Sequence, residues 1–349
     1  MVNATNVIID CDAGVDDALA LYLFLVAHKH RKLRIEAVTC VYGNTDVNNV
    51  ASNVLRVLEL FDNYNIPVHM GAYSPLTSNK EYSRKKEDQF YGSDGFGDIL
   101  KQPDLTKLRF SHAVYALHKY TSDNKGNISI VCLGPLTNIA LAINLYRDFK
   151  QNMKDLYIMG GSLTGQGDIK HITLNFYSDP ESASLVLDNV TKPIYLLPWE
   201  TCLKSRISYD WRVNILGKVN TPFIQMLNRV EDICQLIRKG RKIGRSLDAQ
   251  HYVISDAILA GIVIRPDMAR NICACYADVE LHGSKTRGQI VIDRGSMKKN
   301  VHLIENFDSE TLKQLLLFAV NPDQKDKSVL YSQDPTNKKI LNEDKNAFK

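Results

Sequence analysis

Short apolar segments alternate with longer helix-like segments between residues 6 and 199 of this 349-residue chain. The short segments are β-branched and have the length of buried strands, whereas the others are too long for strands. This alternation predicts an α/β fold with an open, mostly parallel sheet, helices on both faces and right-handed crossovers. The expected strands cover residues 6–10, 34–43, 66–71, 128–134, 155–161 and 193–199, and the expected helices cover residues 16–29, 45–61, 111–121, 135–146 (with Pro135 first) and 179–189.

Composition and charge indicate which partners and which compartment to expect for this protein. The net charge of +4 is small for this length, and no apolar run reaches the roughly 18 residues that span a membrane. We therefore expect neither nucleic acid nor a membrane as a partner. The seven cysteines are scattered, and the N-terminus runs straight into a strand without a signal peptide, which favours a cytoplasmic protein with reduced thiols.

The domain organisation follows from the same composition. No internal repeat or break in composition interrupts residues 1–320, which we expect to form a single catalytic domain. Residues 321–349 are polar and charged, and they predict a C-terminal surface extension that is disordered in part.

An acidic cluster follows the first expected strand. The stretch DCDAGVDD, residues 10–17, places four carboxylates within eight residues. Helix capping explains one or two of these acids, but not four. Carboxylates this close repel one another, and burial strengthens the repulsion. A hard divalent cation would compensate for it. Calcium suits an irregular loop of several Asp residues, and magnesium is an alternative on these grounds.

Glycine and polar residues also follow other expected strands. Gly43-Asn44, Leu133-Gly134 and Met159-Gly160 each stand at the carboxyl end of a strand. Ligands of open parallel sheets bind outside the carboxyl ends of the strands. We therefore expect the acidic cluster and these strand ends to form one active site at that edge of the sheet.

The motifs resemble those of the inosine-uridine-preferring nucleoside hydrolase family. That family consists of metal-dependent enzymes with an open α/β fold. They hydrolyse the N-glycosidic bond of ribonucleosides to ribose and free base with a tightly bound calcium ion, and they are usually homodimers or homotetramers. The resemblance follows the family's order and is carried by DCDAGVDDALAL at 10–21, VYGN at 41–44, LGPLTNIALA at 133–142, MGG at 159–161, NFYSDPESA at 175–183 and SDAILAGIVIRPD at 255–267.

The resemblance implies roles at the metal. Asp12 matches the acid that contacts the metal and acts as general base on the attacking water. Asp17 and Asp256 match carboxylate ligands of the metal, and Leu133 would contribute its backbone carbonyl. Asp10 matches a residue that does not bind the metal itself but positions the loop that does.

The resemblance also implies contacts with the sugar. Asp16 and Asn44 match the residues that hold the ribose 2′- and 3′-hydroxyls, and Asn175 and Met159 match further sugar contacts. Two positions on the 5′ side of the ribose depart from the pattern. Thr173 stands where many members have Glu, and Asp168 stands where Asn is frequent.

A third departure concerns the acid that protonates the leaving base. Ser255 replaces the His or Trp that precedes the last metal acid in other members, and a serine hydroxyl is a very weak acid. Two residues are candidates for the role instead. His251 would lie one turn before Ser255 if residues 248–258 were helical, and Tyr91 stands roughly where some members carry His. Purine nucleosides are the expected substrates, because the purine N7 can take a proton.

Two alternatives remain from the sequence. Asp10 and Asp12 after a first strand resemble the acid pair of haloacid-dehalogenase-type phosphohydrolases, although Gly14 stands where that family usually has Thr or Val. The departures at Thr173 and Ser255 are also compatible with a non-catalytic relative that binds nucleosides.

Overall fold

The structure is a computed structural model that describes residues 5–61, 65–77, 91–99, 101–167, 172–240 (backbone only for 236–240), 251–321 and 326–332. These residues contain one ten-stranded sheet in the order β4-β3-β2-β1-β5-β6-β7-β10-β8-β9. The strands are β1 Thr5–Cys11, β2 Leu33–Cys40, β3 Val68–Met70, β4 Leu108–Arg109, β5 Ile128–Cys132, β6 Leu156–Met159, β7 Ile194–Leu197, β8 Ala269–Val279, β9 Ile290–Asp293 and β10 Val301–Phe307.

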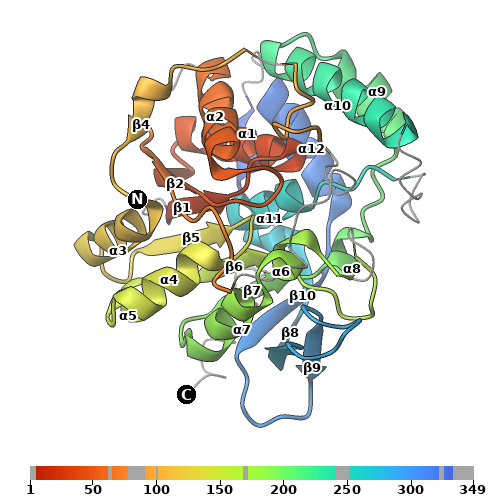
Figure 1. Cartoon of the computed structure of the whole chain (residues 1–349). Helices are drawn as coiled ribbons and strands as arrows, with labels where there is room; N and C mark the ends of the chain where they lie inside the picture. The colour runs from red at the N-terminus through yellow and green to blue at the C-terminus, as the bar shows by residue number, and fades with distance from the viewer. Residues whose placement is uncertain are drawn as a thin grey trace.

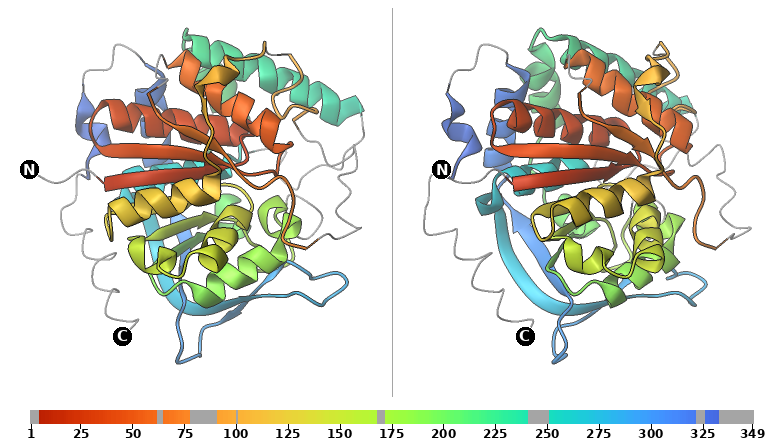
Figure 2. Two further views of the ribbon diagram at one scale, coloured as in Figure 1. Left: turned by 60° about the vertical axis from the view of Figure 1, so that its left-hand side comes forward. Right: turned by 90° about the vertical axis from the view of Figure 1, so that its left-hand side faces the viewer.

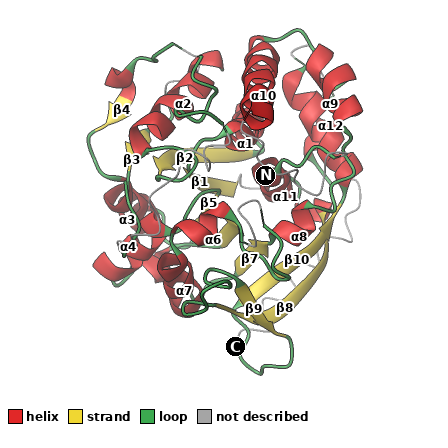
Figure 3. Cartoon of the chain, turned by 45° about the vertical axis from the view of Figure 1, so that its right-hand side comes forward, coloured by secondary structure: helices red, strands yellow, loops and turns green. Residues whose placement is uncertain are grey.

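Helices cover both faces of this sheet (Figures 1 and 3). Figure 2 shows α1 and α3 on opposite sides of β1 and β2. The helices are α1 Val15–Lys29, α2 Val47–Leu60, α3 Ala113–Asp123, α4 Thr137–Leu145, α5 Phe149–Asn152, α6 Leu174–Ser178, α7 Pro180–Asn189, α8 Trp199–Cys202, α9 Tyr209–Asn214, α10 Pro222–Gly240, α11 Ser255–Ile264 and α12 Ser309–Val320, with 3₁₀ turns η3 Leu105–Lys107, η4 Leu216–Lys218, η5 Pro266–Met268 and η6 Lys327–Leu330.

The strand pairings confirm the predicted fold class. Seven of the nine pairings are parallel, and only the β10–β8 and β8–β9 pairs are antiparallel. Side chains of β1 alternate between the two faces, as a strand requires. Val7 and Ile9 pack into the hydrophobic core beneath α1, α2 and α11, and Ile8 packs into the core beneath α3, α4 and α7.

The order of the strands reverses between β1 and β5. From β1 the chain proceeds outward through β2, β3 and β4, and it then returns to the other side of β1 and proceeds through β5, β6 and β7. Loops from two adjacent strands therefore diverge at this point, and open α/β sheets bind their ligands in the resulting crevice. The acidic loop after β1 and Leu133-Gly134 after β5 flank this switch point.

Some predicted boundaries are wrong. Helix α4 begins at Thr137 rather than Pro135, and Leu136 is its N-cap. The predicted strand 34–43 ends at Cys40, since residues 41–45 form the loop that reaches the acidic cluster.

The structure describes Asn321 and residues 326–332 of the predicted C-terminal extension. Leu330 is buried there, and the Val329 carbonyl accepts a hydrogen bond from Arg265 Nη1 at 2.6 Å.

No helix among the described segments has the length and the apolar character that crossing a membrane would require.

Candidate active site

Asp12 lies between the ends of three neighbouring strands. Its Oδ2 accepts a hydrogen bond from the Asn44 backbone N–H at 2.7 Å. A Cβ atom at Gly43 would lie 2.6 Å from Asp12 Cβ, and one at Gly134 would lie 3.0 Å from the same atom. Any side chain at either position would push Asp12 aside. The two glycines that the sequence places after β2 and β5 therefore create the space in which this carboxylate sits.

Asp17 is held in the first turn of α1. Its Oδ2 accepts hydrogen bonds from the Gly14 N–H at 2.8 Å and from Asn44 Nδ2 at 3.2 Å. The first bond caps the N-terminus of α1, where backbone N–H groups lack partners within the helix. Asn44 thus contacts Asp12 through its backbone and Asp17 through its side chain.

Three carboxylates converge where α1 meets α11. Oxygen atoms of Asp16, Asp17 and Asp256 lie within 4.8 Å of one another. Ser255, the first residue of α11, donates its hydroxyl to Asp16 Oδ2 at 3.1 Å. The first turns of both helices carry these acids, so the positive ends of two helix dipoles offset part of the negative charge.

The helix termini do not compensate for the whole charge. Burial raises the pKa of the Asp17 and Asp256 carboxyls well above the usual range, and the neighbouring aspartates raise it further. Within the described part of the chain, Asp17 Oδ1 and Asp256 Oδ1 are buried and have no hydrogen-bond partner. Buried carboxylate oxygens without donors fit a hard divalent cation, which binds such oxygens directly. The residues present therefore fit the metal that the sequence predicts.

Asp10 lies behind this cluster, on the opposite face of β1. Burial raises its pKa to about 7, against the effect of hydrogen bonds from Thr39 Oγ1 (2.5 Å) and Asn138 Nδ2 (2.8 Å). A register slip in β2 brings Thr39 to this place. Val7 pairs with Ile35 but Ile8 pairs with Ala37, so Asp10 faces Thr39, and an unbroken register would place Val38 there.

Asn175 and Met159, two of the residues expected on the sugar side, meet beside Leu133 at the ends of β5 and β6. Asn175 Nδ2 donates to the Leu133 carbonyl at 2.6 Å and to the Met159 carbonyl at 3.1 Å. The Leu133 carbonyl keeps a second lone pair for another ligand. Thr173 Oγ1 accepts from the Gly161 N–H at 2.8 Å, so this side chain fixes the loop after β6. Asp168 lies outside the described residues.

Tyr91, one of the two candidate acids, contacts the cluster. The Tyr91 hydroxyl donates to Asp16 Oδ1 at 3.5 Å, and a Cβ at Gly14 would lie 3.1 Å from the Tyr91 ring. His251 instead forms an isolated antiparallel bridge with Ser208, and α11 begins only at Ser255. The condition that would place His251 one helical turn before Ser255 is therefore not met, because residues 251–254 are not helical. The Tyr252 N–H donates to the Ile207 carbonyl, which holds this segment extended.

Two polar residues that support the site were not predicted: Glu200, which is partly buried, and Asn53, which is fully buried. Glu200 Oε1 accepts from the Leu163 and Thr164 N–H groups, both at 2.8 Å, and so fixes the loop after β6. Asn53 is fully buried in α2 and donates to the Ala13 carbonyl at 2.9 Å. An asparagine between apolar residues of a helix is the signal that identifies such a position, because a buried amide needs partners.

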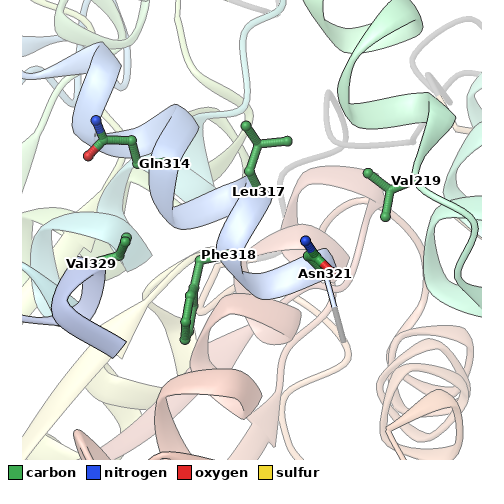
Figure 4. Close-up of a pocket in the computed structure, with 6 residues that line it drawn as sticks. All are labelled: Val219, Gln314, Leu317, Phe318, Asn321 and Val329. Atoms are coloured by element: carbon green, nitrogen blue, oxygen red, sulfur yellow. The ribbon is translucent and has the colours of Figure 1, made fainter. Parts of the chain in front are cut away.

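A cavity of about 290 Å³ lies away from the acidic cluster (Figure 4). It is formed by α12, η4 and η6, and its lining is mostly apolar: Val219, Gln314, Leu317, Phe318, Asn321 and Val329. None of these residues belongs to the predicted site.

The comparisons with known proteins agree with this geometry. Residues 7–314 match the family described as inosine-uridine preferring nucleoside hydrolase. The chain is 30% identical to the pyrimidine-specific ribonucleoside hydrolase RihA of Photobacterium profundum, over 84% of this chain and 90% of that protein.

Solved structures show the same fold. An inosine-guanosine nucleoside hydrolase has a TM-score of 0.79 at 27% identity, covering 90% of this chain and 98% of that one. A purine-preferring ribonucleoside hydrolase from Gardnerella vaginalis has a TM-score of 0.80 at 20% identity, covering 90% and 98%, and this likeness concerns the fold alone.

These findings settle the class of reaction. The family match runs from β1 into α12 and so includes every strand of the sheet and the elements that carry the acidic cluster. Members of the family are metal-dependent enzymes that hydrolyse the N-glycosidic bond of nucleosides, so this chain is an N-glycosyl hydrolase and not a phosphohydrolase. The chain belongs to the inosine-uridine preferring nucleoside hydrolase family.

Proposed function

We propose that this enzyme is a calcium-dependent ribonucleoside hydrolase that favours purine nucleosides, with Asp12 as the general base. The observation that supports the proposal most is the convergence of Asp16, Asp17 and Asp256 at the switch point of the sheet. The buried, donor-free oxygens of Asp17 and Asp256 suit a cation that takes six to eight oxygen ligands in irregular geometry, as calcium does.

Asp12, Asp17, Asp256 and the Leu133 carbonyl would hold the calcium ion. When bound, the ion offsets the negative charge of the cluster and makes a nearby water more acidic. Asp12 would take the proton of the attacking water. The hydrogen bond from the Asn44 N–H to Asp12 Oδ2 orients this carboxylate. General-base catalysis of this kind contributes about 10²- to 10⁴-fold to a rate.

Asp16 and Asn44 would hold the ribose hydroxyls, with Asn175, Met159 and Asp168 as further contacts. Ser255 and Tyr91 donate to different oxygens of Asp16 and so fix its orientation. Departure of the base leaves an oxocarbenium-like sugar, and hydrogen bonds to the ribose hydroxyls strengthen as this charge develops. A fixed Asp16 therefore contributes most in the transition state.

The proposed purine preference rests on the leaving group. Ser255 donates to Asp16 and is too weak an acid to protonate a departing pyrimidine. A purine can take its proton at N7 from solvent or from a neighbouring side chain. The names of similar proteins include both preferences, since one is called a pyrimidine-specific ribonucleoside hydrolase and another an inosine-guanosine nucleoside hydrolase. We further propose a cytoplasmic homodimer or homotetramer.

The proposal is tested by the release of reducing sugar from a panel of ribonucleosides. We expect inosine and guanosine to be hydrolysed faster than uridine and cytidine. Treatment with EGTA should abolish hydrolysis, because the acidic cluster is then left uncompensated, and excess calcium should restore it. Restoration by magnesium but not by calcium would contradict the metal assignment, and faster release from uridine would contradict the base preference. Phosphate release from nucleotides serves as the negative control.

The Tyr91→Phe variant is expected to hydrolyse inosine about ten-fold more slowly or worse, if the phenol supplies the proton to the base. Hydrolysis of p-nitrophenyl riboside should fall less, because its leaving group needs no proton and only the contact of Tyr91 with Asp16 is lost. The matched variant is His251→Ala, which tests the other candidate. The measurement is kcat for both substrates in both variants. If each variant slows the two substrates equally, neither residue is the acid, and activation of the base must come from solvent.

A further inference from the structure

Helix α2 contacts two of the loops that carry active-site residues. The first is the acidic loop, residues 12–17, and the second is the Tyr91 loop, residues 91–99. Asn53 lies in the middle of α2, is fully buried, and uses its single amide group to contact both loops. Its Nδ2 donates to the Ala13 carbonyl at 2.9 Å and to the Asp94 carbonyl at 2.8 Å.

The contact in the acidic loop lies at a strained residue. Ala13 has φ of +27°, a region that residues with a side chain rarely adopt. It stands between Asp12 and the Gly14-to-Asp17 cap, so its conformation sets how the two carboxylates lie relative to each other. Such strain persists only where surrounding contacts enforce it. The hydrogen bond from Asn53 to the Ala13 carbonyl is such a contact.

The contact in the Tyr91 loop belongs to a larger network. Arg56 Nη1 donates to Asn53 Oδ1 at 2.5 Å and to Asp94 Oδ2 at 3.3 Å, and Arg56 Nε donates to the Lys101 carbonyl at 3.0 Å. Thr45 Oγ1 donates to the Ser93 carbonyl at 2.7 Å. These bonds fix the loop from which Tyr91 reaches Asp16.

We propose that Asn53 is a positioning residue that holds the acidic loop and the Tyr91 loop in a fixed mutual arrangement. One amide group bonded to two carbonyls cannot move with one loop without pulling on the other. The metal-binding acids and the phenol beside Asp16 are thus set by the same side chain. The part that concerns catalysis rests on the function proposed above, whereas the part that concerns the two loops does not.

Asn53→Ala is the test variant, and Asn49→Ala is its matched control. Asn49 lies one turn earlier on α2, where its Nδ2 contacts Asp46 Oδ2 at 2.8 Å and Ser93 O at 3.5 Å. We expect Asn53→Ala to lower calcium affinity and kcat for inosine about ten-fold or more, as loss of residues that orient metal ligands does. Hydrogen exchange of the peptide covering 12–17 should rise in Asn53→Ala alone. Exchange of the peptide covering 91–99 should rise more in Asn53→Ala than in Asn49→Ala, whose side chain also contacts Ser93.

Two further variants distinguish the effect of the bond from Asn53 to Ala13 from the effect of the contacts with the Tyr91 loop. Ala13→Gly in the Asn53→Ala background should recover part of the calcium affinity, because glycine adopts positive φ without strain. Arg56→Met should raise exchange in 91–99 but leave calcium affinity and exchange in 12–17 unchanged. Equal calcium affinity, kcat and exchange in Asn53→Ala and Asn49→Ala would overturn the proposal. If Asn53→Ala does not fold, the same comparison is made with Asn53→Asp, which keeps the shape and loses both donors.

Calcium affinity and hydrogen exchange are measured without nucleoside. A wild-type protein that hydrolyses no ribonucleoside would refute the proposed function, and these two measurements would still decide the role of Asn53.

Discussion

Replacing Asp17 or Asp256 by alanine is expected to abolish calcium binding and nucleoside hydrolysis together. Each substitution removes one of the buried carboxylates that converge at the start of α1 and α11. A cation that must lose its hydration shell needs the full set of charged oxygens. Loss of one carboxylate should therefore abolish metal binding instead of lowering the affinity slightly. The measurement is metal analysis of the purified variant, together with release of ribose from inosine.

Asp46→Asn is the control for this pair. It removes the same charge from the exposed N-cap of α2, where asparagine caps a helix as well as aspartate does. Calcium occupancy and activity should be unchanged in this control. Full calcium occupancy in Asp17→Ala and Asp256→Ala would contradict the assignment of both ligands.

Replacing Asp256 by asparagine should stabilise the calcium-free protein, although the substitution removes a proposed metal ligand. The pKa of Asp256 is raised in the folded protein, mainly by burial, so the folded state loses stability as the pH rises above the ordinary carboxyl pKa of about 4. Asp256→Asn removes this loss without changing the shape of the side chain. In EGTA at neutral pH, its melting temperature should exceed that of the wild type, and the difference should vanish as the pH falls toward the ordinary pKa.

Replacing Asp12 by asparagine is expected to lower kcat by a factor on the order of 10² to 10⁴ while the fold and part of the metal binding persist. The amide keeps the shape of the carboxylate in the space between Gly43 and Gly134, and its oxygen can still accept from the Asn44 N–H. Only the basicity is lost. The measurement is kcat for inosine at saturating calcium.

The pH dependence of kcat in Asp12→Asn provides a second readout. If Asp12 is the base, activity of the variant should rise with hydroxide concentration, since solvent must then take the proton. Turnover close to that of the wild type, with ribose still the product, would show that another group accepts the proton.

The parallel half of the fold was predictable from local patterns because its strands are buried on both faces. Strands β1, β2, β5, β6 and β7 each lie at the predicted place within a few residues, and β5, β6 and β7 are buried along their whole length. The antiparallel strands β8 to β10 were not predicted. The burial of β8, for example, is intermediate along much of its length, which gives a weak periodic signal.

The site was predictable only where a residue's role follows from its chemistry. Four acids in eight residues indicate a cation, whatever the fold. The place of His251 depends on the pairing of Tyr252 with Ile207, and no local pattern contains that contact. The role of Thr173 likewise follows from the nearby Gly161 N–H, which the sequence does not place beside it. Contacts between distant segments decided these two positions.

The hydrogen bond from Ser255 to Asp16 joins residues 239 positions apart. The chain must therefore be synthesised beyond Ile264, the end of α11, before α11 docks on α1 and the acids of the two helices meet. Contacts this distant in sequence form late, because the entropy of closing the loop is lost before they contribute. If the proposed calcium ion binds only the assembled cluster, it stabilises the complete fold over partly folded states by mass action. On this proposal, metal binding stabilises the contact between α1 and α11, and calcium supply during synthesis should limit the yield of native enzyme.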